Sequence, residues 1–92
     1  MAGRREATAK IINKKGLHAR ASAKLVEAAA RFSSHITVTK EGQTVDARSI
    51  MGLMMLGAGQ GTPIELRAEG WDAKEALEAL AALVESGFNE QG

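Results

Sequence analysis

Cysteine and tyrosine are absent from the 92 residues of this chain. Without cysteine the chain can form no disulfide, no thiolate nucleophile and no cysteine-based zinc site. The aromatic residues are two phenylalanines and one tryptophan, too few for a surface on which single-stranded nucleic acid could stack. The formal net charge is only +1, so a broad basic field is missing as well. We therefore expect no nucleic-acid partner.

Long apolar runs are also missing. No stretch approaches the ~20 residues that a membrane span needs. The basic start, Met1 to Arg5, leads into an alternating segment and not into the apolar block of a signal peptide. We expect a cytoplasmic protein without membrane insertion. The length fits one domain over residues 1–92 that needs no disulfide or metal to fold.

Hydrophobic periodicity predicts elements in the order β-α-β-β-α-β-α. Strands are expected over residues 6–12, 36–39, 43–47 and 63–68. The first helix begins at Ala19, and its expected apolar stripe comprises Ala21, Leu25, Ala28 and Phe32. A single apolar stripe on each helix suits helices that lie on one face of a sheet, which predicts an α+β fold.

The last helix has the clearest local start signal. Asp72 and Glu75 form a capping-box-like pair, and Trp71 and Ala76 stand where a hydrophobic staple forms. We therefore expect Trp71 to pack against the protein. Gly87 is a plausible helix stop. The expected buried stripe of this helix comprises Leu77, Leu80 and Val84.

His18 is the first candidate for chemistry. It stands in Gly16-Leu17-His18-Ala19-Arg20, directly before an alanine-rich helical run. Unpaired N–H groups and the positive end of the helix dipole collect there, so the position suits a phosphate and keeps the imidazole neutral. A neutral imidazole nitrogen can accept a phosphoryl group. A loop histidine that merely caps the helix also fits this spacing.

Arg20 and Ser49 are the next candidates. The guanidinium of Arg20 can stabilise phosphoryl oxygens, although a solvated residue of the first turn fits as well. Ser49 is an N-cap for a short helix, and a phosphate at that point would meet N–H groups of the helix. Arg48 beside it could attract a phosphate or an acidic side chain of a kinase. A serine that only caps the helix fits the same pattern.

The short helix after Ser49 is apolar on every side. One helix cannot bury all faces of such a run against one sheet, so we expect some of Ile50, Met51, Met54 and Met55 to be exposed. Exposed methionines suit an adaptable docking surface, whereas core residues with incidental exposure are the alternative. His35 has no second ligand at metal spacing and is expected at the surface.

Two motifs at the right separation resemble the HPr family, the histidine phosphocarriers of the phosphoenolpyruvate-dependent phosphotransferase system in bacteria. Gly16-Leu17-His18-Ala19-Arg20 looks like the active-site motif of that family. Ala47-Arg48-Ser49-Ile50-Met51-Gly52-Leu53 looks like its second signature, around a regulatory serine. The resemblance extends from about Glu6 to Gly87.

The resemblance implies an open-faced β-sandwich, in which an antiparallel sheet of order 1-4-2-3 carries three helices on one face. It also implies a carrier that is not itself an enzyme, acts as a monomer and needs neither cofactor nor metal. His18 would take a phosphoryl group on Nδ1 from phosphorylated Enzyme I and pass it to an Enzyme IIA-type protein, while Arg20 steadies it. Ser49 would be modified by HPr kinase/phosphorylase. The implied binding residues are Ala19, Arg48, Ile50, Met51, Leu53 and Met54.

One residue departs from the family pattern. Proline usually follows the motif arginine, and Ala21 stands here. Alanine keeps the helix and restores an N–H that could serve as a donor. With alanine at this position, the sequence resembles family members with regulatory roles, including nitrogen-related ones, more than members devoted to sugar transport. Two other functions stay open: a regulatory interaction domain that uses Ser49 and the methionine-rich helix with His18 idle, and a small anion-binding domain.

Overall fold

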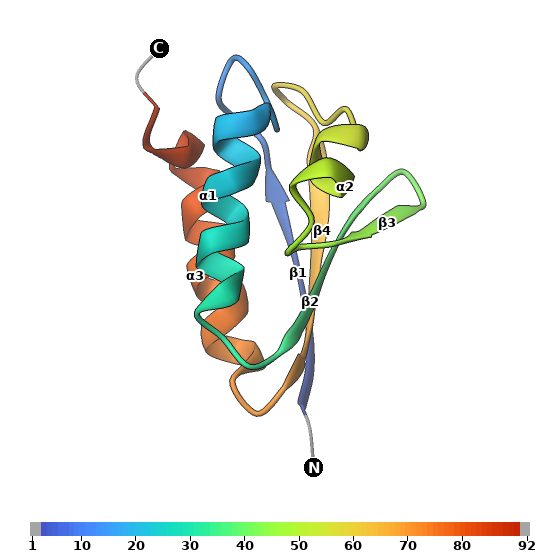
Figure 1. The fold of residues 1–92 in the computed structure, drawn as a ribbon, viewed down its shortest axis with the longest axis vertical. Coiled ribbons are helices and arrows are strands. Elements are labelled where there is room, and N and C mark those ends of the chain that lie inside the picture. Colours follow the sequence, from blue (N-terminus) through green and yellow to red (C-terminus); the bar gives the residue numbers. More distant parts are fainter. Residues whose placement is uncertain (1–2, 91–92) are drawn as a thin grey trace.

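The computed structural model describes residues 3–90, so the expected domain over residues 1–92 extends beyond the described residues at both ends. Four strands and three α-helices follow one another in the predicted order β-α-β-β-α-β-α, and a short 3-10 turn comes after them (Figure 1). The elements are β1 (Gly3–Lys10), α1 (Ala19–Ala30), β2 (His35–Lys40), β3 (Gln43–Asp46), α2 (Ile50–Met55), β4 (Pro63–Gly70), α3 (Ala73–Glu85) and η1 (Gly87–Asn89).

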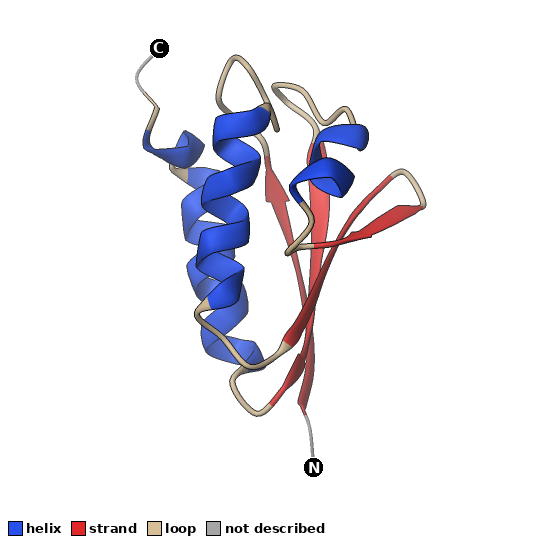
Figure 2. Cartoon of the chain, in the orientation of Figure 1, coloured by secondary structure: helices blue, strands red, loops and turns tan. Residues whose placement is uncertain are grey.

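The strands form one antiparallel sheet in the order β1-β4-β2-β3. Figure 2 shows the helices gathered on one side of this sheet, with α1 and α3 running along each other. The predicted α+β class and the sheet order implied by the resemblance are both confirmed. No helix within residues 3–90 has the length and apolarity to cross a membrane.

The core lies between the sheet and the helices. Alternation along β4 buries Ile64, Leu66 and Ala68 on one face, as the sequence predicts. The stripe of α3 predicted from helical spacing is also confirmed. Its members Leu77, Leu80 and Val84 are all buried.

No helix within residues 3–90 covers the other face of the sheet, and this face is polar. Arg67 of β4 lies opposite Glu6 of β1 and Thr37 of β2. Its Nε lies 3.2 Å from the carboxylate of Glu6, an ion pair between half-exposed side chains. Because such pairs contribute about 0–1 kcal/mol, the helix-covered face supplies most of the stabilisation.

The first strand and the first helix differ from their predicted bounds. β1 begins at Gly3 and ends at Lys10, since Arg4 and Arg5 pair with β4 on an edge strand whose outer face tolerates charge. The helix α1 ends at Ala30, two residues before Phe32. Its fully buried residues are Ala21, Ser22, Leu25 and Ala29, whereas Ala28 and Phe32 are only half-buried. The hydroxyl of Ser22 donates to the carbonyl of Leu17 (3.0 Å), which satisfies this polar side chain in the core.

The predicted capping box and staple of the last helix are wrong. Asp72 is the N-cap residue, but its side chain accepts no helix N–H. It accepts from the backbone N–H groups of Ser33 (2.8 Å) and Ser34 (2.9 Å) and from the hydroxyl of Ser34 (2.5 Å). Trp71 is 80% exposed and does not pack against the protein. The carboxylate of Asp72 thus joins the turn before α3 to the turn after α1. Local spacing in the sequence does not reveal such a contact.

Candidate functional site

His18 is the N-cap residue of α1, with extended backbone (φ −72°, ψ 178°). The hydrogen bonds of this helix begin at Ser22, whose N–H donates to the carbonyl of His18 at 2.9 Å. Within residues 3–90, the N–H groups of Ala19, Arg20 and Ala21 therefore have no backbone acceptor. His18 thus stands beside the group of donors that the sequence predicted.

The loop before His18 is held from two sides. Gly16 has a left-handed backbone (φ +61°), and the N–H of Leu17 donates to the carbonyl of Ala58 (3.0 Å). The side chain of Leu17 is buried, and its carbonyl accepts from Ser22 of α1. These contacts fix the backbone of His18 from the α2–β4 connection and from the helix.

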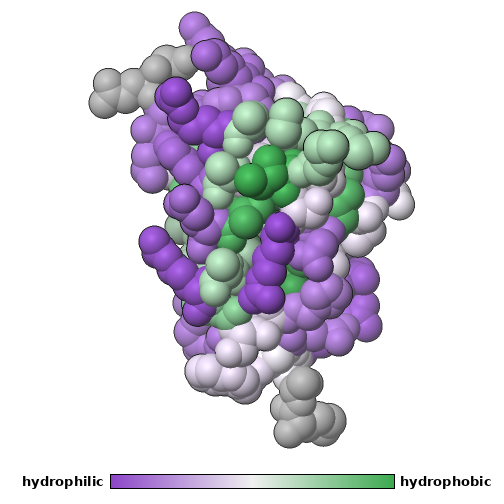
Figure 3. Space-filling model, in the orientation of Figure 1, coloured by the Kyte–Doolittle hydropathy of each residue, from purple (hydrophilic) through white to green (hydrophobic). Residues whose placement is uncertain are grey.

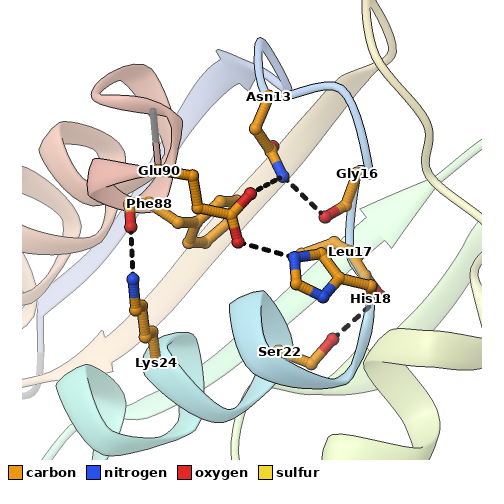
Figure 4. A network of polar contacts seen from close by, with 8 residues as sticks. All are labelled: Asn13, Gly16, Leu17, His18, Ser22, Lys24, Phe88 and Glu90. Atoms are coloured by element: carbon orange, nitrogen blue, oxygen red, sulfur yellow. Dashed lines mark hydrogen bonds and ion pairs between the residues drawn. The ribbon is translucent and has the colours of Figure 1, made fainter. Parts of the chain in front are cut away.

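Glu90 lies against His18, which the sequence did not predict. Its Oε2 is 2.6 Å from Nε2 of His18, and its Oε1 accepts from Nδ2 of Asn13 at 2.9 Å (Figure 4). The hydrogen bond with His18 is the largest cause that lowers the pKa of Glu90. The hydrogen bond from Asn13 and the positive charge of Lys24 lower this pKa further. His18 and Glu90 are 72 positions apart, so no local pattern could reveal their contact.

The segment that carries Glu90 is anchored nearby. Phe88 is fully buried despite a left-handed backbone (φ +57°). Its carbonyl accepts from Nζ of Lys24 at 2.6 Å (Figure 4). Gly87, the predicted helix stop, has φ +68° after α3 ends at Glu85. The buried ring and the Lys24 contact therefore hold residues 88–90 beside α1.

A hollow of about 560 Å³ opens beside His18 and Glu90. Lys15, Arg20 and Lys24 also line it, so most of its charged side chains are cationic. Arg20 is exposed, and its guanidinium has no partner among residues 3–90. An exposed cation next to helix N–H groups can stabilise the oxygens of an incoming phosphoryl group.

Ser49 is the N-cap of α2, as predicted. Its Oγ accepts from the N–H of Gly52 at 2.9 Å. The guanidinium of Arg48 instead donates to the carbonyls of Ala29 (3.3 Å) and Phe32 (2.5 Å) at the end of α1. Arg48 thus satisfies carbonyls at the C-terminal end of that helix.

The exposed face of α2 is apolar. Met51 is 74% exposed and Met54 44%, while Ile50 and Met55 are exposed as well. Figure 3 shows the hydrophobic patch over α2. Met54 and His18 line one shallow hollow, and Ala19 is exposed at the start of α1. The prediction that Leu53 contributes to a docking surface is wrong, because the side chain of Leu53 is fully buried.

His35 is exposed at the start of β2, as predicted. Its Nε2 lies 3.5 Å from a carboxylate oxygen of Asp46. Across the described part of the chain, residues 3–90, no cluster of three His, Asp or Glu side chains has metal-binding geometry.

Residues 5–86 match the family model described as the PTS HPr component phosphorylation site. The phosphocarrier protein HPr of Cupriavidus necator is 52% identical over 80 residues, which cover 87% of this chain and 90% of that relative. The phosphocarrier protein HPr of Neisseria meningitidis serogroup A is also 52% identical over 80 residues, with the same coverage.

Solved structures agree with the sequence matches. The crystal structure of HPr-C-His from Thermoanaerobacter tengcongensis has a TM-score of 0.91 and 50% identity, covering 96% of this chain and 99% of that one. A crystal structure of an HPr dimer from the same organism has a TM-score of 0.75 and 51% identity, covering 94% and 99%. The fold, the histidine at the helix N-terminus and these matches agree: the chain belongs to the HPr family, the phosphocarriers of the phosphotransferase system.

Proposed function

We propose that His18 accepts a phosphoryl group on Nδ1 from phosphorylated Enzyme I and passes it to an Enzyme IIA-type protein. The lone pair of Nδ1 forms the new N–P bond as the bond between phosphorus and the donor breaks. The N–H groups of Ala19, Arg20 and Ala21 carry this proposal, since they have no backbone acceptor in the described structure and are available to phosphoryl oxygens. The guanidinium of Arg20 adds charge stabilisation.

The exposed face of α2 supports docking of both partners beside His18. Ile50, Met51 and Met54 offer apolar contact area, and Ala19 extends it to the start of α1. A carrier must present the same face to donor and acceptor in turn, so we expect it to work as a monomer. We also expect it to be cytoplasmic, to need no cofactor and to have no catalytic turnover of its own.

Incubation with Enzyme I and phosphoenolpyruvate tests the relay. The parent protein should gain an acid-labile, alkali-stable phosphohistidine, and His18→Ala should gain none. His35→Ala is the matched control, because it removes the only other histidine, which is exposed at the start of β2. Phosphate uptake by His18→Ala at the rate of the parent would refute the proposal.

Regulation through Ser49 is the second part of the proposal. A phosphate added by HPr kinase/phosphorylase would put negative charge beside Ile50 and the apolar face of α2, and should weaken docking to Enzyme I. Arg48, the residue before Ser49, is exposed, so an acidic group of the kinase can reach it. Ser49→Asp should raise KM for phosphoryl uptake, whereas Ser49→Ala should leave it near the parent value. Unchanged kinetics in Ser49→Asp would contradict an inhibitory role.

The alternative is a regulatory interaction domain that acts through Ser49 and α2 without phosphoryl relay. Comparing His18→Ala and Ser49→Ala for partner binding and for phosphate delivery separates the two functions. A relay loses phosphate delivery in His18→Ala, whereas a purely regulatory domain loses partner binding in Ser49→Ala alone. The replacement of the usual proline by Ala21 bears on which acceptor is served, in sugar transport or in a regulatory circuit.

A further inference from the structure

The helix layer carries a groove between α1 and α3 on the side that faces away from the sheet. Its volume is about 520 Å³. The two helices run antiparallel along each other (Figure 1). Small or apolar side chains line the middle of the groove, namely Ala28 of α1 and Ala79, Ala82 and Leu83 of α3. Side chains of this size let a further helix approach both walls closely.

The two walls of this groove carry opposite charge. On α1, the cationic side chains of Lys24 and Arg31 line it. On α3, Glu78 and Glu85 are exposed, and each directly precedes a residue that lines the groove. Within residues 3–90, Arg31, Glu78 and Glu85 form no ion pair. Lys24 donates to the carbonyl of Phe88 and has two further N–H donors. These charges are therefore available to another molecule.

The charges on the two walls also have the same spacing. Seven positions separate Lys24 from Arg31, and seven separate Glu78 from Glu85. Each pair therefore spans about 10 Å along its helix axis. Because α1 and α3 are antiparallel, Lys24 and Glu85 lie toward the end of the layer that holds His18 (Figure 1). Arg31 and Glu78 lie farther from that end.

We propose that this face binds a second copy of the chain, with a two-fold axis parallel to the helices, so that α1 of each copy lies against α3 of the other. Arg31 of one copy then meets Glu78 of the other. Lys24 likewise meets Glu85, and the symmetry forms each ion pair twice. Glu27, between the two cations of α1, faces the uncharged middle of α3. The alternative with α1 against α1 would bring the cations together, so the charges select the first arrangement.

This pairing goes beyond the phosphoryl relay and leaves its docking face open. The helix α1 packs against α3 on one side and against α2 on the other (Figure 1). The exposed face of α2 therefore lies outside the proposed contact. Exposed ion pairs are individually weak and are screened by salt, so the pairing is reversible. The monomer expected for the relay is the form at low concentration, and the pair is the form at high concentration.

Sedimentation equilibrium of the full chain measures this association. At low ionic strength the parent should pass from monomer to dimer with a Kd of about 0.1–1 mM. Addition of about 0.5 M NaCl should raise the Kd at least fivefold, because the ions screen the charges that face each other.

Charge reversal tests the arrangement itself. Arg31→Glu and Glu78→Arg should each raise the Kd about tenfold, since each variant puts like charges together twice. An equimolar mixture of the two variants should associate as the parent does, because every reversed residue then meets its opposite charge. The double variant should do the same. Glu41→Arg, an equal charge reversal at the turn between β2 and β3, is the matched control and should keep the parent Kd. Circular dichroism checks that each variant is folded.

Four outcomes would overturn the inference. The first is a parent that stays monomeric at low ionic strength up to the millimolar range. The second is a dimer whose Kd is the same in Arg31→Glu, because such a dimer uses another surface, such as an edge of the sheet. The third is a mixture of Arg31→Glu and Glu78→Arg that does not associate. The fourth is a monomeric parent whose binding to Enzyme I is lost in Arg31→Glu, which would assign this face to that protein instead.

Discussion

Two glycines with the same backbone conformation but different surroundings allow a matched test of the loop before His18. Gly16 has φ +61° and Gly57 has φ +63°. A Cβ at Gly57 would meet no atom within 4 Å, whereas a Cβ at Gly16 would overlap the carbonyl oxygen of Ala58 and lie 2.8 Å from Cα of Gly59. The two alanine variants thus share the backbone strain and differ in steric overlap.

The magnitudes follow from these contacts. Left-handed backbone costs an alanine about 1 kcal/mol, which is the whole expected loss of unfolding free energy for Gly57→Ala. At Gly16 the loop must also move away from Ala58, which breaks the hydrogen bond from Leu17 (3.0 Å) to that carbonyl. That bond adds about 0.5–1.5 kcal/mol, and displacement of the packed Leu17 adds a similar amount. We expect a total of about 2–4 kcal/mol for Gly16→Ala.

Urea unfolding of both variants and the parent measures the difference. Gly16→Ala should also slow phosphoryl uptake from Enzyme I, because Leu17 directly precedes His18, while Gly57→Ala should leave uptake near the parent rate. Equal destabilisation of the two variants would refute the reasoning, since it would mean that the loop yields to the extra methyl group without losing its contact with Ala58.

The remaining predictions concern other parts of the fold. Hydrogen bonds, above all from the hydroxyl of Ser34, hold the pKa of Asp72 below the usual 3.8. Its ionised form therefore stabilises the fold above about pH 4, and this contribution is lost as pH falls through the lowered pKa, so thermal unfolding of the parent should depend more steeply on acid pH than that of Asp72→Asn. Leu53→Ala should lower the unfolding free energy by about 2–5 kcal/mol because Leu53 is fully buried. Met51→Ala should change it by less than about 0.5 kcal/mol, yet raise KM with Enzyme I; an unaltered KM would argue against docking on α2. Ala21→Pro removes an N–H that α1 does not use, so circular dichroism should show an intact fold, and phosphorylated His18 should hydrolyse faster if that N–H holds the phosphoryl group.

Periodicity was sufficient for the elements that bury one face. The alternation of Ile64, Leu66 and Ala68 and the spacing of Leu77, Leu80 and Val84 predicted faces that the structure confirms. The stripe of α1 was placed less well, because alanines occupy many of its positions and give little contrast between a buried and an exposed face. The start of β1 was missed because Arg4 and Arg5 on an edge strand show no apolar alternation.

By itself, the sequence determined the order of elements, the placement of His18 at a helix N-terminus and the N-cap at Ser49, since each depends on neighbours a few residues away. Only the tertiary structure decided what Asp72 and Glu90 contact. Asp72 accepts from Ser34 across 38 positions, and Glu90 meets His18 across 72. Hydrogen bonds depend on distances of about 3 Å in space, and the sequence does not reveal which distant residues meet until the sheet and helices pack together.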